Sequence, residues 1–363
     1  MEKEFLIKNL LDQSETCGKT SDLYRDMLII ISKSENYLDL MIDIFNKRKF
    51  NGAIEICLLL ASFFHNLALE NKHNEIRGFF KTYSGNYDQT LFNQLKTTLE
   101  DIFKKYENEI SDWLLEKKLQ TNEVARSSVI YPLLLSLNLE KINLFEIGCS
   151  AGLLLFPDKY SYKYKKNNEF FEIKNVNLII ETEINDLEKL KNILKNQEKI
   201  QITKRIGFDL NPLDINNREN QNLLKSAIWD DKERELRLDK AINIFEKYKN
   251  EVYLESLDYT KNLAERISFL STPDSEIVVF TSVSTYQVDK ESHDKLILEL
   301  EKTAKLTSKK VYFLQFEGKR KDQDLTIELT EEEPFYLSVT IFPEKKETFF
   351  AKAHFHGKKL SIL

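Results

Sequence analysis

The chain has 363 residues, and its 53 Lys and Arg against 59 Asp and Glu leave a formal net charge of −6. Apolar residues make up 42%, which is enough for a large core and excludes a disordered chain. The acidic balance argues against a surface that binds nucleic acid as a whole. Three widely spaced cysteines fit neither a disulfide framework nor a zinc site, so we expect no metal.

The N-terminus lacks the apolar stretch of a signal peptide, and no apolar run reaches the length of a membrane span. We therefore expect a cytoplasmic protein with no membrane partner. Residues 1–120 show helical periodicity. Ser21 and Asp22 are typical N-cap residues, and the apolar side chains that follow have helical spacing, as do those of residues 52–69 and 91–106. This pattern predicts an all-helical N-terminal domain over residues 1–120.

After residue 140 short apolar runs rich in β-branched and aromatic residues alternate with helical segments. The predicted strands are residues 142–147, 202–208, 252–257, 276–283 and 310–316, and the predicted helices include 221–249 and 290–305. Strands that alternate with helices indicate a mostly parallel sheet in an α/β domain, here over residues 121–363. Residues 325–363 look strand-like and predict an antiparallel C-terminal edge. Residues 160–201 form an insertion, which we expect to be a lid.

The segment LFEIGCSAGLLL predicts a strand, a tight turn with Gly148 and Gly152, and the start of a helix. Such a turn lets a ligand approach the backbone, and the free N–H groups of a helix start favour an anion. A dinucleotide fingerprint needs glycine where Ser150 and Leu153 stand, so it fits poorly. Residues 148–152 also match the G-x-S-x-G elbow of serine hydrolases, with Ser150 as nucleophile.

The same turn resembles the cofactor loop of class I S-adenosylmethionine-dependent methyltransferases, in which an acidic residue, here Glu146, closes the first strand. The second predicted strand ends at Asp209, whose carboxylate can accept two ribose hydroxyls. The third is followed by Asp258, which can hold the adenine amino group. The order and type of these three acids match the methyltransferase pattern.

Several blocks of the sequence are similar to those of an uncharacterised prokaryotic family, domain of unknown function twenty-three thirty-two. They are QTNEVAR, EIGCSAGLLLFPDKYSY, GFDLNPLDI, IWDDKERELRLDKAI and the pair His356-Gly357, and they occur in the family's order from about residue 50 onward. The resemblance implies a Rossmann-like methyltransferase-type sheet and a cofactor pocket, and it implies no substrate. Pro157 departs from the pattern and should end the first helix after about a turn and a half.

Other interpretations stay open at this point. Ser150 could form a hydrolase triad with His354 or His356 and with Asp258 or Asp274. The alternation His354-x-His356 places both rings on one face of a strand, where they could bind a metal. Basic and aromatic residues alternate from Lys159 to Lys166, as in platforms that bind single-stranded nucleic acid, although a solvent-exposed edge strand is favoured. A scaffold without catalysis is a further alternative.

The favoured interpretation is a methyltransferase that transfers a methyl group from S-adenosylmethionine to a small molecule. Its expected cofactor-binding residues are Glu146, Gly148, Ser150, Gly152, Asp209 and Asp258. Tyr286 and His356 are the expected catalytic residues, with His356 as a proton acceptor brought to the pocket rim by a bend at Gly357. Arg126 is the expected contact for an anionic group of the substrate, and nucleic acid is not an expected partner.

Overall fold

The computed structural model describes residues 1–48, 52–195 and 200–363. The chain divides into two compact units, one formed by Met1–Thr121 with Ile215–Leu236 and the other by Asn122–Asp214 with Arg237–Leu363. The sequence indicated a single boundary near residue 120. The structure differs in that the chain returns to the first unit at residue 215. Helix α10, Lys232–Tyr248, begins in the first unit and ends in the second.

The first unit is helical in its described residues, as the periodicity indicated. It contains α1 (Lys3–Gly18), α2 (Asp22–Ile31), α3 (Glu35–Lys47), α4 (Ala53–Leu69), α5 (Asn74–Arg77), α6 (Phe92–Glu116) and α9 (Arg218–Ser226). Ser21 caps α2 by accepting the N–H of Tyr24, which confirms the predicted N-cap. Helix α4 is apolar all round and nearly all of it is buried, as expected for a central helix.

The second unit is built on one sheet of eleven strands in the order β3-β2-β4-β11-β10-β9-β8-β7-β1-β5-β6. Its strands are β1 (Lys141–Ile147), β2 (Ser161–Lys166), β3 (Glu169–Ile173), β4 (Ile179–Ile184), β5 (Gln201–Asp209), β6 (Val252–Ser256), β7 (Glu276–Ser282), β8 (Val311–Gly318), β9 (Phe335–Phe342), β10 (Lys346–Ala353) and β11 (Lys359–Ile362). The five strands predicted between residues 140 and 316 are confirmed within two residues at each end.

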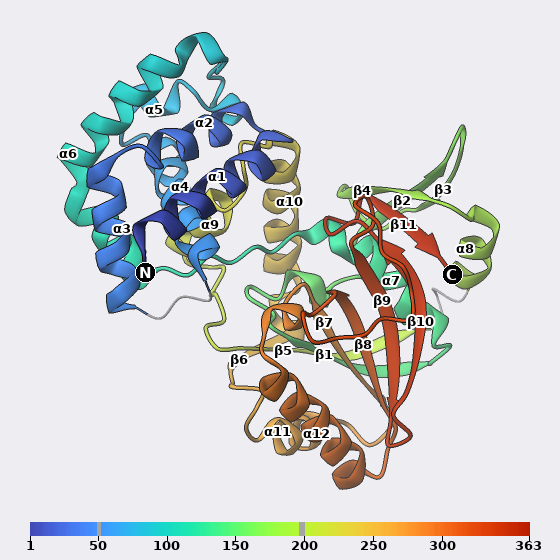
Figure 1. Ribbon diagram of the computed structural model, residues 1–363. Helices are drawn as coiled ribbons and strands as arrows, with labels where there is room; N and C mark the ends of the chain where they lie inside the picture. Colours follow the sequence, from blue (N-terminus) through green and yellow to red (C-terminus); the bar gives the residue numbers. More distant parts are fainter. Residues whose placement is uncertain (49–51, 196–199) are drawn as a thin grey trace. The chain divides into compact units, whose positions relative to one another are not determined.

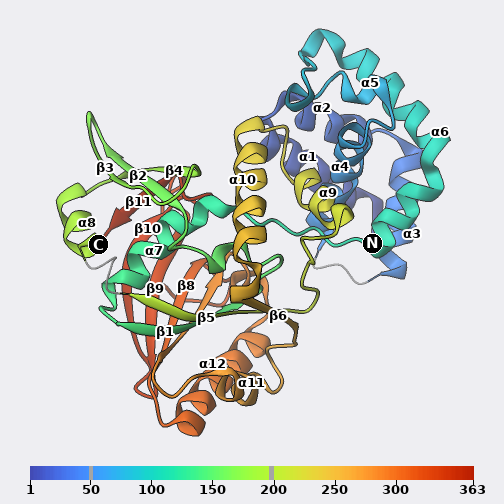
Figure 2. The same ribbon diagram turned by 180° about the vertical axis from the view of Figure 1, so that it is seen from behind.

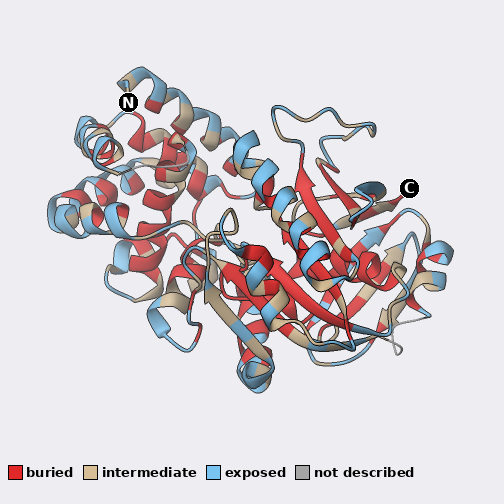
Figure 3. Ribbon diagram, turned by 90° about the horizontal axis from the view of Figure 1, so that it is seen from below, coloured by how far each residue is buried: buried red, intermediate tan, exposed pale blue. Residues whose placement is uncertain are grey.

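Strands β6, β5, β1, β7 and β8 are parallel neighbours, so the five predicted strands lie in the order third, second, first, fourth, fifth. Helices α11 (Leu263–Leu270) and α12 (Lys290–Thr307) pack on one face of these strands (Figure 1) and share their apolar core. Helix α7 (Ser127–Ser136) contacts β4, β8 and β9, and it packs against helix α8 (Leu187–Leu194), which contacts β2 and β3 (Figure 2). Figure 3 shows how much of the sheet is buried.

Two expectations about the sheet are wrong. Strands β9, β10 and β11 are joined by antiparallel pairing, but they lie inside the sheet rather than at its edge. The reason is that the insertion supplies β2, β3 and β4, and β4 pairs in parallel with β11. The insertion is therefore an extension of the sheet and not a separate lid. The edge strands of this sheet are β3 and β6.

Strand β2 also contradicts the idea of an aromatic platform. Tyr160, Tyr162 and Tyr164 are fully buried, and their hydroxyls donate to backbone carbonyls. Lys163 and Lys165 point outward and pair with glutamates of the neighbouring strands. Buried rings cannot stack on nucleic-acid bases, so the alternation reflects the two faces of a strand.

No helix in the described ranges, 1–48, 52–195 and 200–363, is both long and apolar enough to cross a membrane.

Candidate functional site

The candidate site lies at the carboxyl ends of the parallel strands, between β1 and β7. Within the five parallel strands, the one that follows β1 in the chain, β5, lies on one side of this pair, and the one that follows β7, β8, lies on the other. In open α/β sheets this point is where ligands usually bind. Glu146 of β1 lies in register with Gly207 of β5 and Phe280 of β7. It is 2% exposed, and its Oε2 atom has no hydrogen-bond partner in the described structure. The structure thus presents a buried carboxylate oxygen at the switch point.

Burial raises the pKa of Glu146 well above its usual value, and the negative charge of Asp209 raises it further. The positive charge of Arg126 acts in the opposite direction. Asp209 and Arg126 therefore both lie close enough to influence the carboxyl group of Glu146. A carboxyl group held in this way would gain stabilisation from a ligand that brings positive charge or hydrogen-bond donors.

The predicted tight turn is present, with positive φ at Gly148 (74°), Ser150 (50°) and Gly152 (71°). Its glycines are required by close packing within the protein. A Cβ atom at Gly148 would lie 2.9 Å from Cβ of Ser284, and one at Gly152 would lie 2.8 Å from Cδ2 of Leu254. Protein side chains thus occupy the positions into which a Cβ atom of either glycine would extend.

The helix expected after this turn is absent. The turn is followed by a single 3-10 turn, Leu153–Leu155, and the chain then reaches Pro157 and enters β2. The expectation of about a turn and a half of helix before Pro157 is therefore wrong, because no α-helix forms there. A helix N-terminus that could hold an anion is not available here, and the strand-turn-helix context of a hydrolase elbow is also missing.

Asp209 supports the turn directly. Its Oδ2 atom accepts the N–H of Ser150 at 2.9 Å, and its Oδ1 atom accepts the N–H of Asn211 at 2.9 Å. Each carboxylate oxygen retains a second lone pair, so further donors can still be bound. Because Asp209 holds the backbone of the glycine turn, its removal should affect stability as well as ligand binding.

Asp258 is engaged within its own loop. Its Oδ1 atom accepts the N–H of Thr260 at 3.0 Å and the Thr260 hydroxyl at 2.6 Å, while Oδ2 lies 3.1 Å from Nζ of Lys261. The hydrogen bonds from Thr260 lower the pKa of Asp258. This geometry is that of a turn-forming aspartate.

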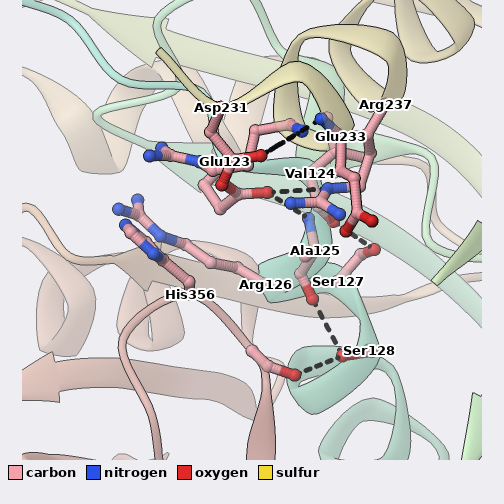
Figure 4. Close-up of polar contacts among 12 residues, drawn as sticks. Glu123, Val124, Ala125, Arg126, Ser127, Ser128, Asp231, Glu233, Arg237 and His356 are labelled. Atoms are coloured by element: carbon pink, nitrogen blue, oxygen red, sulfur yellow. Dashed lines mark hydrogen bonds and ion pairs between the residues drawn. The ribbon is translucent and has the colours of Figure 1, made fainter. Parts of the chain in front are cut away.

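Arg126 lies in a 3-10 turn, Val124–Arg126, and is 5% exposed. Its Nε atom donates to the carbonyl of Phe355 at 3.1 Å. Gly357 has a φ of 72°, and a Cβ atom there would lie 2.3 Å from the carbonyl oxygen of Ala125. The predicted bend at Gly357 thus exists and packs beside Arg126, and Figure 4 shows the side chains of Arg126 and His356 extending in the same direction.

His356 lies in the turn between β10 and β11 and not in a strand. His354 is also outside both strands, and its Nδ1 atom accepts the N–H of His356 at 3.1 Å. The expectation that the two rings share one face of a strand is therefore wrong. Among the described residues no group of three His, Cys, Asp or Glu side chains is arranged to hold a metal ion.

Tyr286 lies in a 3-10 turn after β7, Thr285–Gln287. Its ring packs edge-on against Phe335 at 5.3 Å, and Phe335 in turn contacts Phe355, next to His356. Burial raises the pKa of Tyr286. An aromatic contact chain therefore links the turn of Tyr286 with the turn of His356.

Three residues at this end of the sheet were missed by the sequence analysis. Asn122 donates its side-chain N–H to the carbonyl of Cys149 at 3.1 Å, and its Oδ1 atom is buried with no partner in the described structure. The hydroxyl of Ser282 is likewise buried and has no hydrogen-bond partner in the described structure. Glu317 is the penultimate residue of β8, and its carboxyl group is buried. The rule that located Glu146 and Asp209, an acidic residue at a strand end, also identifies Glu317.

A groove of about 600 Å³ lies at the opposite ends of β5 and β6. It is lined by Gln201, Ile202, Thr203, Lys204, Arg205, Ile206, Asn250, Glu251, Val252, Tyr253 and Leu270. Because these residues are at the amino ends of the strands, the groove is separate from the candidate site.

The chain belongs to the family described as "Uncharacterized protein conserved in bacteria (DUF2332)", whose profile matches residues 8–361. The resemblance inferred from the sequence blocks is thereby confirmed at the level of the family. No curated protein and no solved structure matched the chain significantly.

Proposed function

From the order of the parallel strands and the chemistry of their ends, we propose that the chain is an S-adenosylmethionine-dependent methyltransferase with a small-molecule acceptor. The observation that carries the proposal is the unpartnered Oε2 atom of Glu146, buried at the switch point of the parallel strands. A buried carboxylate oxygen without a partner is costly, and the ammonium group of an amino-acid cofactor would supply the missing donor.

The residues present fit two portions of this cofactor. Glu146 would hold the amino group. Asn122, which donates to the carbonyl of Cys149 in the turn, offers its unpaired Oδ1 atom as a second acceptor. Asp209 keeps lone pairs for the ribose hydroxyls while it holds the backbone of Ser150. Asp258 fits the adenine less well, since its carboxylate is occupied by Thr260 and Lys261.

When bound, the cofactor supplies an electrophilic methyl group on a sulfonium. The contribution of the protein would be to align the acceptor with this methyl group and to exclude water, and such positioning can supply several kcal/mol of the barrier. Tyr286 and His356 would orient the acceptor, and the imidazole of His356 would accept the proton that the acceptor releases. Arg126 would bind an anionic group of the same molecule.

The test is a binding measurement by calorimetry with S-adenosylmethionine and S-adenosylhomocysteine. We expect the wild-type protein to bind both, and Glu146→Gln and Asp209→Ala to bind each at least about tenfold more weakly, the scale of a lost charge-assisted hydrogen bond. Glu333→Gln is the control, because Glu333 is also a buried carboxyl group of the second unit and has no proposed contact with the cofactor. Wild-type protein that binds neither compound would refute the proposal.

The hydrolase alternative rests on Ser150, whose positive φ of 50° is the backbone strain expected at a nucleophile elbow. A generic esterase assay with wild-type protein and Ser150→Ala separates the two functions. Activity that is lost in the variant would favour the hydrolase. Cofactor binding without any methylated product from a cell extract would favour a scaffold instead.

A further inference from the structure

The connection after β7 has a strained residue at its start. Val283 has a φ of 56°, in the left-handed region that β-branched side chains rarely adopt. Its N–H donates to the carbonyl of Phe316 at 2.8 Å. A non-glycine residue in this conformation costs free energy and persists only where other contacts impose it. Other contacts must therefore hold this connection, residues 283–287, in its shape.

The side chain of Glu317 supplies them. Its Oε2 atom accepts the backbone N–H groups of three consecutive residues, Ser284 at 3.0 Å, Thr285 at 3.1 Å and Tyr286 at 3.1 Å. Glu317 is 1% exposed, so these bonds form away from solvent. Hydrogen bonds from N–H groups to a charged acceptor are roughly twice as strong as neutral ones. One buried carboxylate therefore fixes the backbone of the whole connection.

The connection contacts the glycine turn after β1 and also Gly318 at the end of β8. The Cβ atom of Ser284 fills the space beside Gly148, and its hydroxyl donates to the carbonyl of Ile147 at 3.4 Å. The ring of Tyr286 packs over Gly318, 3.2 Å from where a Cβ atom would be. Movement of the connection would thus shift the glycine turn and Tyr286 together.

A further observation points to a ligand at this place. Ser282, directly before the strained residue, is 6% exposed, and its hydroxyl has no hydrogen-bond partner in the described structure. Ser282 is two residues beyond Phe280, the register partner of Glu146, so Ser282 and Glu146 lie on the same face of the sheet. These two buried polar groups on one face of a strand end are available to bind a polar ligand.

We propose that Glu317 is a positioning residue of this site, which holds residues 283–287 in a strained conformation and thereby places Ser284 and Tyr286 beside the ligand. The ligand part of this inference rests on the proposed function. The claim that Glu317 fixes the backbone of residues 283–287 does not depend on the proposed function, because it concerns hydrogen bonds within the chain. The two parts can therefore be tested separately.

The first test is hydrogen exchange of the backbone amides of residues 284–286. In Glu317→Gln the side chain keeps its size but exchanges one acceptor oxygen for a donor, so these amides should exchange at least about tenfold faster than in the wild type. Glu333→Gln should leave their exchange unchanged. In a Val283→Gly background the effect of Glu317→Gln should be smaller, because glycine removes the strain that Glu317 opposes. Equal exchange in wild type and Glu317→Gln would overturn the proposal.

The second test is the affinity for S-adenosylhomocysteine, which should fall at least about tenfold in Glu317→Gln and remain unchanged in Glu333→Gln. Faster amide exchange with unchanged affinity would overturn the positioning role. If the wild type does not bind this compound, the proposed function fails, while amide exchange still decides whether Glu317 holds the connection. If Glu317→Gln does not fold, the wild type alone still provides a test. Unprotected exchange of the wild-type amides of residues 284–286 would show that Glu317 does not fix the connection.

Discussion

His65 provides a test of how burial controls the stability of the helical unit. It lies in α4 and is 0% exposed, with Nδ1 3.1 Å from the hydroxyl of Tyr24 and Nε2 2.9 Å from that of Tyr83. Its ring stacks on Phe80 at 4.7 Å. Burial lowers its pKa from 6.5 to about 4, because the charged imidazolium is poorly solvated there.

A lowered pKa means that the unfolded chain takes up a proton at a higher pH than the folded unit does. The contribution to stability is therefore complete above about pH 6.5 and is lost as the pH falls toward about 4. The lowered pKa contributes about 3 kcal/mol to stability near neutral pH, and nearly all of this is lost by pH 4. This is a large part of the stability of a typical domain.

The variant His65→Gln keeps a hydrogen-bond donor and an acceptor at this position, but its side chain cannot titrate. Both tryptophans, Trp113 and Trp229, lie in the first unit, so their fluorescence during urea unfolding reports on that unit. The variant should be less stable than the wild type near pH 7.5, and this difference should shrink by about 3 kcal/mol near pH 4. Carboxylates common to both proteins cancel in the comparison.

The control is His73→Gln, because His73 is in the same unit but only partly buried, so its effect on the pH dependence should be smaller. If the difference between wild type and His65→Gln is the same at both pH values, the charge state of His65 does not influence stability as we describe.

Two further predictions concern the second unit. Burial and Asp209 raise the pKa of Glu146, so its ionisation lowers stability as the pH rises above about 4.5. Glu146→Gln should therefore raise the urea midpoint in circular dichroism near pH 8, with the gap closing toward about pH 4, and an equal midpoint at both values would contradict this. Gly152→Ala should lower the free energy of unfolding by about 1–2 kcal/mol, because it combines a positive φ with a clash against Leu254. In a Leu254→Ala background this loss should be smaller, and an undiminished loss would show that the clash is unimportant.

Local sequence patterns determined most of the secondary structure. The runs of β-branched and aromatic residues after residue 140 became β1, β5, β6, β7 and β8 within two residues at each end. The alternation of strands with helices correctly indicated parallel pairing. These features depend on side-chain periodicity along the chain, which the sequence shows directly. The strand-end acids Glu146 and Asp209 were found for the same reason, because their position follows from the strand that precedes each of them.

Contacts between distant segments were decided by the tertiary structure alone. Residues 215–236 returned to the helical unit, although their helical pattern did not distinguish the two units. The insertion joined the sheet through β4 and so placed β9 to β11 in its interior. Which strand lies next to which depends on how the whole set of apolar faces is buried, and that is not a local property.

At the candidate site, too, some features follow from the local sequence and others only from the tertiary structure. The motif of residues 148–152 predicted a glycine turn, and the turn is there with positive φ at both glycines. That Ser284 and Leu254 fill the space beside these glycines was visible only in the folded chain. Likewise, Glu317 was readable as the end of a strand, but its bonds to three amides of another connection were not. Sequence specifies which groups a strand end carries, and packing between segments far apart in the chain decides which of those groups remain free to bind a ligand.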